Sequence, residues 1–212
     1  MHIILHQPEI PANTGNIGRT CVATGTDLHL IEPLGFRLTE KEIKRAGMDY
    51  WQHLSVTRYM NFQEFHSLHP GAKIWMATTK ARHSYTDVSF GPDDYLMFGK
   101  ESAGIPEEIL IEHEETCIRI PMLPEIRSLN LSNSVAIVLY EALRQQGFAS
   151  MQLQGELHRL HWNATPAKTP PESYARKAAW TALPPLKPAS HCSDISEQTS
   201  PPCWQQALKA QR

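Results

Sequence analysis

The chain has 212 residues, a length that suits one globular domain or one domain followed by a tail. Hydrophobic residues make up 41% of it, which is enough for a substantial core. The formal net charge of −2 excludes a protein that is basic overall. A nucleic-acid partner would therefore have to be met by a local basic patch.

Neither the start of the chain nor any later segment indicates export or membrane insertion. Residues 1–7 are too short and too polar for a signal peptide, and no apolar run approaches the ~18–20 residues of a membrane span. The four cysteines are scattered and form no C-x-x-C pair. We therefore expect a reduced, cytoplasmic protein with no membrane partner.

The expected elements alternate between short apolar runs and helical patterns. Taken in chain order, they are a strand at His2–His6, a helix from about Asn16 to Thr24, a strand at Leu28–Ile31, a helix starting at Thr39, a strand at Leu54–Tyr59, a helix at Asn61–Leu68, strands at Lys73–Thr78, Tyr95–Phe98 and Cys117–Ile120, and a long helix at Leu131–Gln145. This alternation predicts an α/β domain with a mainly parallel sheet and helices on both faces.

Composition changes near residue 160. Eight of the 16 prolines lie at or after Pro166. Residues 1–150 carry 13 Lys and Arg against 18 Asp and Glu, whereas residues 151–212 carry seven against four. A polar, proline-rich segment cannot bury enough apolar surface to offset the entropy lost on ordering. We expect a folded domain over residues 1–157 and a disordered tail over residues 158–212.

Three polar segments follow strands of the expected sheet, at the edge where parallel α/β sheets bind ligands. The first is N-T-G-N-I-G-R at 13–19, where a helix starting near Asn16 would aim free N–H groups at a phosphate, with Arg19 on its first turns. The second is F-G-K-E-S-A-G-I-P at 98–106, which matches neither a dinucleotide fingerprint nor a phosphate-binding loop. A capped helix start and a plain strand-to-helix connection remain the respective alternatives.

The third segment, residues 120–134, is unusual for a simple connection. Two prolines stiffen its entry, and small polar residues at positions 128, 130, 132 and 133 precede a strongly apolar helix. One Ser or Asn would be enough to cap that helix. The excess indicates hydrogen bonding to a ligand, although repeated capping remains open. The chain has no H-E-x-x-H motif and no paired Cys/His cluster, so we expect no bound metal.

Together, these segments resemble the SPOUT class of RNA methyltransferases, and within it the small tRNA wobble-nucleotide 2′-O-methyltransferases of the TrmL (YibK-like) type. The resemblance runs from about His2 to Phe148. It is carried by N-T-G-N-I-G-R (13–19), L-H-L-I-E-P-L-G-F (28–36), R-A-G-M-D-Y (45–50), Y-L-M-F-G-K-E-S (95–102), I-P-M-L-P (120–124) and R-S-L-N-L-S-N-S-V-A-I-V-L-Y-E-A-L-R-Q (127–145). It implies a C-terminal trefoil knot, S-adenosyl-L-methionine as cofactor, and methylation of cytidine or uridine 34 in the anticodon loop of tRNA, with leucine tRNAs as the expected set.

The resemblance also implies roles for individual residues. Arg19 would be the catalytic residue, facing the cofactor of the other subunit in a homodimer. Ala77, Thr78, Gly99, Ile120, Ser128 and Leu129 would contact the cofactor, and Asn16, Arg127, Asn133 and Tyr140 would bind RNA or the partner subunit. The chain departs from many relatives at Ala103, where arginine is common, and at Ile126, where a small polar residue is common. Two other functions remain open: 2′-O-methylation of another tRNA or rRNA nucleotide, and non-catalytic RNA binding.

Overall fold

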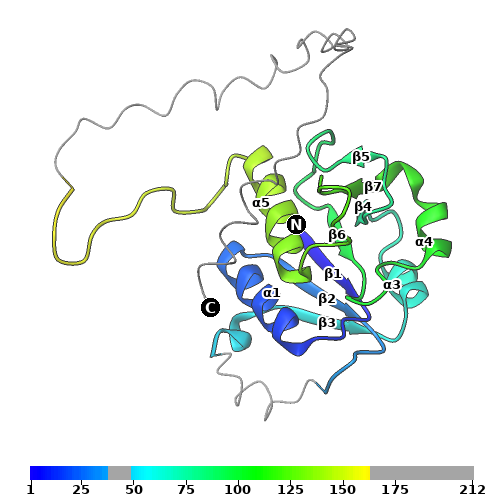
Figure 1. Ribbon diagram of the computed structural model, residues 1–212. Coiled ribbons are helices and arrows are strands. Elements are labelled where there is room, and N and C mark those ends of the chain that lie inside the picture. The colour runs from blue at the N-terminus through cyan, green and yellow to red at the C-terminus, as the bar shows by residue number, and fades with distance from the viewer. Residues whose placement is uncertain (38–48, 163–212) are drawn as a thin grey trace, which may run out of the picture. The chain divides into compact units, whose positions relative to one another are not determined.

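The computed structural model describes residues 1–37 and 49–162, which form a seven-stranded sheet flanked by helices (Figure 1). The strand order is β3-β2-β1-β6-β4-β7-β5, and all pairings between these strands are parallel, which confirms the predicted mainly parallel sheet. The strands are β1 (His2–His6), β2 (Asp27–Ile31), β3 (Val56–Tyr59), β4 (Ile74–Ala77), β5 (His83–Ser84), β6 (Tyr95–Phe98) and β7 (Cys117–Arg119).

Helices cover both faces of this sheet, as predicted. Alternate side chains of one strand serve two separate cores: Ile3 and Leu5 of β1 belong to one, and Ile4 belongs to the other. Two longer helices complete the first core, and two shorter ones complete the second. These are α1 (Pro11–Thr24) and α5 (Leu131–Gln145) on the first face, and α3 (Phe62–Leu68) and α4 (Glu107–Glu112) on the second.

The strongly patterned elements lie close to where the sequence predicts them. β1, β6 and α5 have the predicted bounds, and the other predicted strands agree within two residues at each end. Asn61 caps α3 by accepting a hydrogen bond from the Glu64 backbone N–H, and Gly147 ends α5 with a left-handed φ of 70°. The helix expected to start at Thr39 and the chain from residue 163 onward lie outside the described residues.

The predicted start of the first helix was wrong. α1 begins at Pro11 rather than near Asn16, so the 13–19 segment is helical throughout and offers no free N–H groups at Asn16. The N-cap residue, Ile10, makes no side-chain capping bond. Instead, the carboxylate of Glu101 accepts hydrogen bonds from the backbone N–H groups of Glu9 and Ile10, at 2.8 and 3.3 Å. The cap comes from a residue about 90 positions away, and therefore no local pattern could reveal it.

The sequence also failed to reveal several short elements. β5 pairs with β7 alone, through His83 and Ser84. α4 has six residues, and two 3-10 turns, η1 (Asp49–His53) and η2 (Glu114–Thr116), are shorter still. Segments of this length contain too few side chains for a periodic pattern to emerge, so their form depends on what they pack against.

A cluster of histidines and tyrosines lies on the α3 face of the sheet. His29 is 6% exposed, and its Nδ1 lies 2.9 Å from the hydroxyl of Tyr59, which in turn lies 2.9 Å from Nε2 of His69. The other His29 nitrogen, Nε2, lies 3.4 Å from Nδ1 of His2. Burial, together with the neighbouring His2 and His69, lowers the pKa of His29 to about 4. The fold therefore favours the neutral ring, which can donate at one nitrogen and accept at the other.

This cluster predicts a loss of stability in acid. The unfolded chain takes up a proton at His29 near the ordinary pKa of about 6.5, whereas the folded chain resists it down to about 4. Folding is therefore disfavoured progressively as pH falls from about 6.5 to 4, and the effect is absent at higher pH, where both states are neutral. We expect His29 to contribute about 2 kcal/mol to this loss, discounted for partial solvent screening.

Urea unfolding measured from pH 8 to pH 4 checks this prediction. In His29→Gln, whose side chain can hydrogen-bond but not titrate in this range, the unfolding free energy should fall less steeply with acid than in the wild type. Parallel curves for the two proteins between pH 6.5 and 4 would show that His29 is not the responsible group.

Candidate functional site

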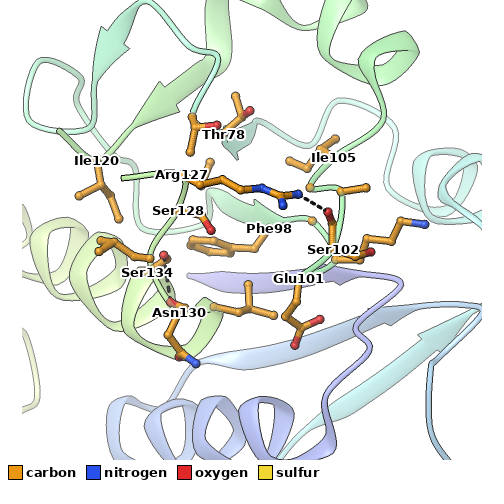
Figure 2. A pocket seen from close by; sticks show the side chains of 18 of the residues that line it. Thr78, Phe98, Glu101, Ser102, Ile105, Ile120, Arg127, Ser128, Asn130 and Ser134 are labelled. Atoms are coloured by element: carbon orange, nitrogen blue, oxygen red, sulfur yellow. Dashed lines mark hydrogen bonds between the residues drawn. The ribbon is translucent and has the colours of Figure 1, made fainter. Parts of the chain in front are cut away.

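A cavity of about 610 Å³ lies at the carboxyl ends of the central strands. Its walls come from the β1–α1 connection, the segments that follow β4 and β6, and the long loop between β7 and α5 (Figure 2). Residues from these segments that line it include Ile10, Asn13, Ala77, Thr78, Lys80, Gly99, Lys100, Glu101, Ser102, Ile120, Arg127, Ser128, Leu129 and Asn130. Its volume falls within the range of small-molecule and cofactor sites, about 300–1,000 Å³.

All six residues expected to contact the cofactor line this one cavity. They are Ala77, Thr78, Gly99, Ile120, Ser128 and Leu129. Ala77 ends β4, Gly99 follows β6, and Ile120 follows β7, so parallel strands bring them to one edge of the sheet. Thr78 continues the β4–β7 pairing by donating its backbone N–H to the Ile118 carbonyl at 2.9 Å.

The remaining predicted residues divide into two groups. Arg127 lines the cavity, whereas Asn16, Arg19, Asn133 and Tyr140 do not. Asn16, Arg19 and Asn133 are exposed, and Tyr140 is 45% exposed on α5. The structure therefore separates a cavity set from a set of exposed residues on α1 and α5.

A hydrogen-bonded chain joins three walls of the cavity. Glu101 accepts from the side chain of Asn13 at 2.9 Å, in addition to its two backbone donors at the start of α1. The Asn13 carbonyl oxygen accepts from the Asn130 side-chain amide at 3.0 Å. The Oδ1 atom of Asn130 caps α5 by accepting from the backbone N–H groups of Ser132 and Asn133. One network thus holds the starts of both helices and the loop after β6 in fixed relation.

Ser102 forms a second junction. Its backbone N–H and hydroxyl both donate to the carboxylate of Glu9, at 2.9 and 2.8 Å, and these bonds lower the pKa of Glu9. Its carbonyl oxygen accepts from Nη2 of Arg127 at 2.8 Å. In Figure 2 the Arg127 side chain reaches from the last loop across the cavity to Ser102. The loop after β6 and the loop before α5 are thereby tied together.

The loop after β6 can close only because residue 99 is glycine. A Cβ atom there would lie 2.0 Å from the carbonyl carbon of Gly104 and 2.1 Å from the nitrogen of Ile105. Lys100 and Gly104 form an antiparallel bridge, with the Gly104 N–H donating to the Lys100 carbonyl at 2.8 Å. Gly104 itself has a φ of 74°, a conformation that other residues adopt at a cost.

Arg19 lies on the outer side of α1, where it meets the 3-10 turn that follows the undescribed residues 38–48. Its guanidinium lies 5.0 Å from the centre of the Tyr50 ring. The Tyr50 hydroxyl donates to the Gly15 carbonyl at 2.7 Å. Burial raises the pKa of Tyr50, and the Arg19 guanidinium offsets part of this effect. These contacts place the exposed arginine over Tyr50, and it does not line the cavity of its own chain.

The sequence alone assigned no role to several residues that build the site. Asn130 was expected to bind a ligand or to cap the helix, and it caps α5. Glu101 and Asn13 fall inside the quoted segments without an assigned role, because the network that joins them to Asn130 depends on separations of 88 and 117 residues. Lys80 and Lys100 line the cavity and were not predicted either. Lys100 stands next to Gly99, a signal that was too general to assign a contact, and the residues on either side of Lys80 offer no such signal.

The described part of the chain holds neither a metal-binding cluster nor a membrane-spanning helix. Among residues 1–37 and 49–162, no three His, Cys, Asp or Glu side chains lie close enough to hold a metal ion. No helix within the same ranges has the length and hydropathy that crossing a membrane requires.

The fold and the cavity define a parallel α/β protein with a loop-built ligand site at the carboxyl ends of its strands. Residues 1–140 match the family model described as the SpoU rRNA methylase family, and the chain therefore belongs to that family. The resemblance to SPOUT methyltransferases seen in the sequence is thereby confirmed.

Relatives and solved structures agree with this membership. The chain is 49% identical over 150 residues to a tRNA (cytidine(34)-2′-O)-methyltransferase of Aeromonas hydrophila, over 70% of this chain and 96% of that protein. A structure concerned with 2-OH methylation of C/U34 on tRNA is 44% identical, with a TM-score of 0.65 over 69% of this chain and 95% of its own. An AdoMet-bound rRNA methyltransferase from Sinorhizobium meliloti is 26% identical, with a TM-score of 0.60 over 68% and 55% of the two chains.

The tight closure of the loop after β6 predicts that Gly99→Ala is strongly destabilising. The added methyl group would meet backbone atoms, which cannot rotate away, so we expect a loss of about 3 kcal/mol in unfolding free energy. Gly155→Ala is the matched control, because nothing lies within 4 Å of a Cβ atom there, and it should change stability by less than about 0.5 kcal/mol. Equal effects of the two changes in thermal unfolding would contradict this account of the loop.

Proposed function

We propose that this protein transfers the methyl group of S-adenosyl-L-methionine to the ribose 2′-hydroxyl of nucleotide 34 in the anticodon loop of tRNA, in the cytoplasm. As a member of its family, it is an RNA ribose 2′-O-methyltransferase. The observation that carries the proposal is the meeting of six predicted cofactor residues around one cavity. The relative named for cytidine 34 supports the position, and we extend it to uridine 34 and to leucine tRNAs.

The cavity suits the proposed cofactor in size and chemistry. S-adenosyl-L-methionine has a flat base, a ribose, and an amino acid end with both charges, so it needs apolar walls together with hydrogen-bonding groups. Ala77, Ile120 and Leu129 supply apolar surface, and Thr78 and Ser128 supply hydroxyls. Small side chains leave the neighbouring backbone groups within reach of a ligand. The bound cofactor would supply a methyl group on a positively charged sulfur.

We infer that the loops around the cavity form the trefoil knot implied by the family resemblance. In support, the strand order β6-β4-β7 is not sequential, and the loops after β6 and β7 meet at Ser102 and Arg127. We assign the activity to residues 1–157 and leave the expected tail outside the catalytic domain.

We also propose a homodimer in which the exposed residues of α1 and α5 complete the cavity of the partner subunit. Arg19 and Asn16 project from α1, and Asn133 and Tyr140 project from α5, and none of them lines the cavity of its own chain. Their exposure together with their distance from that cavity supports a role across the interface. Arg127 remains on its own cavity, where it can meet the RNA.

The reaction forms a bond between the ribose O2′ and the methyl carbon, breaks the bond between that carbon and sulfur, and releases the hydroxyl proton to water. The tasks of the protein are alignment of O2′ behind the methyl group and stabilisation of negative charge on O2′. An arginine side chain is a poor base, because a guanidinium stays protonated at neutral pH and has no free electron pair with which to accept a proton. We therefore assign Arg19 to holding the adjacent phosphate and the developing alkoxide.

Labelled S-adenosyl-L-methionine incubated with unfractionated tRNA tests the function. We expect base-stable label that maps to the 2′-oxygen of nucleotide 34. Label at another tRNA or rRNA nucleotide would replace the proposed substrate, and the absence of transfer to any RNA would favour a non-catalytic RNA-binding role.

The role of Arg19 has its own test. Arg19→Ala should lower the transfer rate by at least about 100-fold, because a preorganised charge at the reacting oxygen is lost. The dissociation constant for the cofactor, measured by calorimetry, should stay within about twofold of the wild-type value. Arg82→Ala, which removes an arginine 83% exposed outside the cavity, serves as control and should keep full activity. Loss of cofactor binding in Arg19→Ala would contradict the assigned role.

A further inference from the structure

Lys100 stands on a rigid part of the cavity wall. It follows Gly99, whose lack of a side chain permits the loop to close, and its carbonyl accepts the Gly104 N–H at 2.8 Å. The neighbouring Glu101 is held by three donors at the start of α1. The backbone of Lys100 is thus fixed on both sides, and the residue lines the cavity.

The three cations that line the cavity differ in their partners. Lys80 forms an ion pair with Glu107. Arg127 donates to a backbone carbonyl, that of Ser102, so its positive charge is not neutralised by that bond. Within residues 1–37 and 49–162, no carboxylate forms an ion pair with Lys100 either. Two positive charges on the cavity wall therefore lack an anionic partner among the described residues.

The positive charge of Lys100 affects the pKa values of two nearby side chains. Burial is the largest cause that lowers the pKa of His6, and the positive charge of Lys100 adds to it. The hydrogen bonds from Ser102 are the largest cause that lowers the pKa of Glu9, and the charge of Lys100 adds to this effect as well. His6 is 5% exposed at the end of β1, and its Nδ1 is buried without a hydrogen-bond partner. The neutral His6 ring brings no negative charge. The Glu9 carboxylate keeps its charge while it accepts from Ser102, and it forms no ion pair with Lys100. Lys100 therefore remains able to pair with an anionic ligand.

The proposed cofactor is a poor match for that charge. Its amino acid end carries a positive and a negative group, and its sulfur is positive, so the whole molecule is cationic. An RNA phosphate is a full anion and binds lysine and arginine strongly. Because the chain has a net charge of −2, its affinity for RNA has to come from local cations such as these.

We propose that Lys100 and Arg127 form a clamp for one backbone phosphate of the RNA beside the target ribose. The clamp rests on the proposed function and adds a substrate-positioning residue, Lys100, to it. Both residues line the cavity, and their loops meet where Arg127 donates to the Ser102 carbonyl, two residues along the chain from Lys100. A phosphate held between them fixes the strand at the cavity mouth, and neither residue reads a base.

The salt dependence of RNA binding tests the clamp. An anticodon stem-loop RNA is titrated with the full-length protein at several salt concentrations, with S-adenosylhomocysteine present so that no methyl transfer occurs. Lys100→Gln should bind the stem-loop RNA about fivefold more weakly at 0.1 M salt. The slope of its log affinity against log salt concentration should also be shallower by about 0.7, because one phosphate contact on a single strand contributes about that much. Lys100→Arg should restore both values.

Two control variants show whether the effect belongs to the clamp or to a general loss of positive charge. Arg82→Gln removes the same charge outside the cavity and should leave the slope unchanged. In an Arg127→Gln background, Lys100→Gln should have a smaller effect than in the wild type, because the shared phosphate is no longer held from the other side. An unchanged slope in Lys100→Gln, or an equal change in Arg82→Gln, overturns the clamp.

Measurements on the cofactor and on turnover separate the clamp from the proposed function. A fall in the affinity for S-adenosyl-L-methionine in Lys100→Gln would mean that Lys100 holds the cofactor carboxylate instead, and would overturn the clamp. The wild-type protein is assayed for methyl transfer in parallel. Absence of methyl transfer by the wild type counts against the proposed function. The salt dependence of RNA binding decides the clamp whether or not the wild type transfers a methyl group.

Discussion

The carboxylate of Glu101 is the group on which the rest of the site depends. It accepts hydrogen bonds from the backbone at Glu9 and Ile10 and from the side chain of Asn13, and so caps a helix whose own N-cap residue cannot. A negative charge at this end of a helix also interacts favourably with the helix dipole. Asn13 in turn accepts a hydrogen bond from Asn130, and Asn130 caps α5. Loss of the Glu101 side chain would remove the bonds that tie the loop after β6 to the start of α1.

The residues expected to contact the cofactor differ in kind from the charged residues that join the loops. The cofactor residues are small or apolar, and their positions follow from the ends of parallel strands and from the closure at Gly99. Charged groups lie at the junctions between loops, where Glu9 and Arg127 both meet Ser102. The loop after β6 and the loop before α5 each carry both kinds of residue, with Lys100 next to Gly99 and Arg127 next to Ser128, so neutral and positive groups lie side by side on the cavity wall.

Prediction from sequence succeeded where the physical cause is local. The strands β1 and β6 and the helix α5 were predicted with their bounds because several successive residues repeat the same burial pattern. It failed at α1, because the capping carboxylate lies about 90 residues away, and at β5 and α4, which are too short to show a period. Among the site residues, family resemblance supplied the cavity set and Arg127, whereas Glu101 and Asn13, which also hold the loops together, were not assigned a role.

The sequence by itself determined the parallel α/β class, the membership of the methyltransferase family and the positions of the segments that carry chemistry. The spacing of apolar residues and the polar segments that follow strands are patterns among residues close together in the sequence, and they can therefore be identified from the sequence alone. Only the tertiary structure decided that Arg19 lies over Tyr50 and not on its own cavity, that Arg127 reaches Ser102, and that Glu101 accepts from the start of α1. Each of these rests on a contact between residues distant in the sequence or on the direction of a side chain, and three-dimensional packing alone sets both.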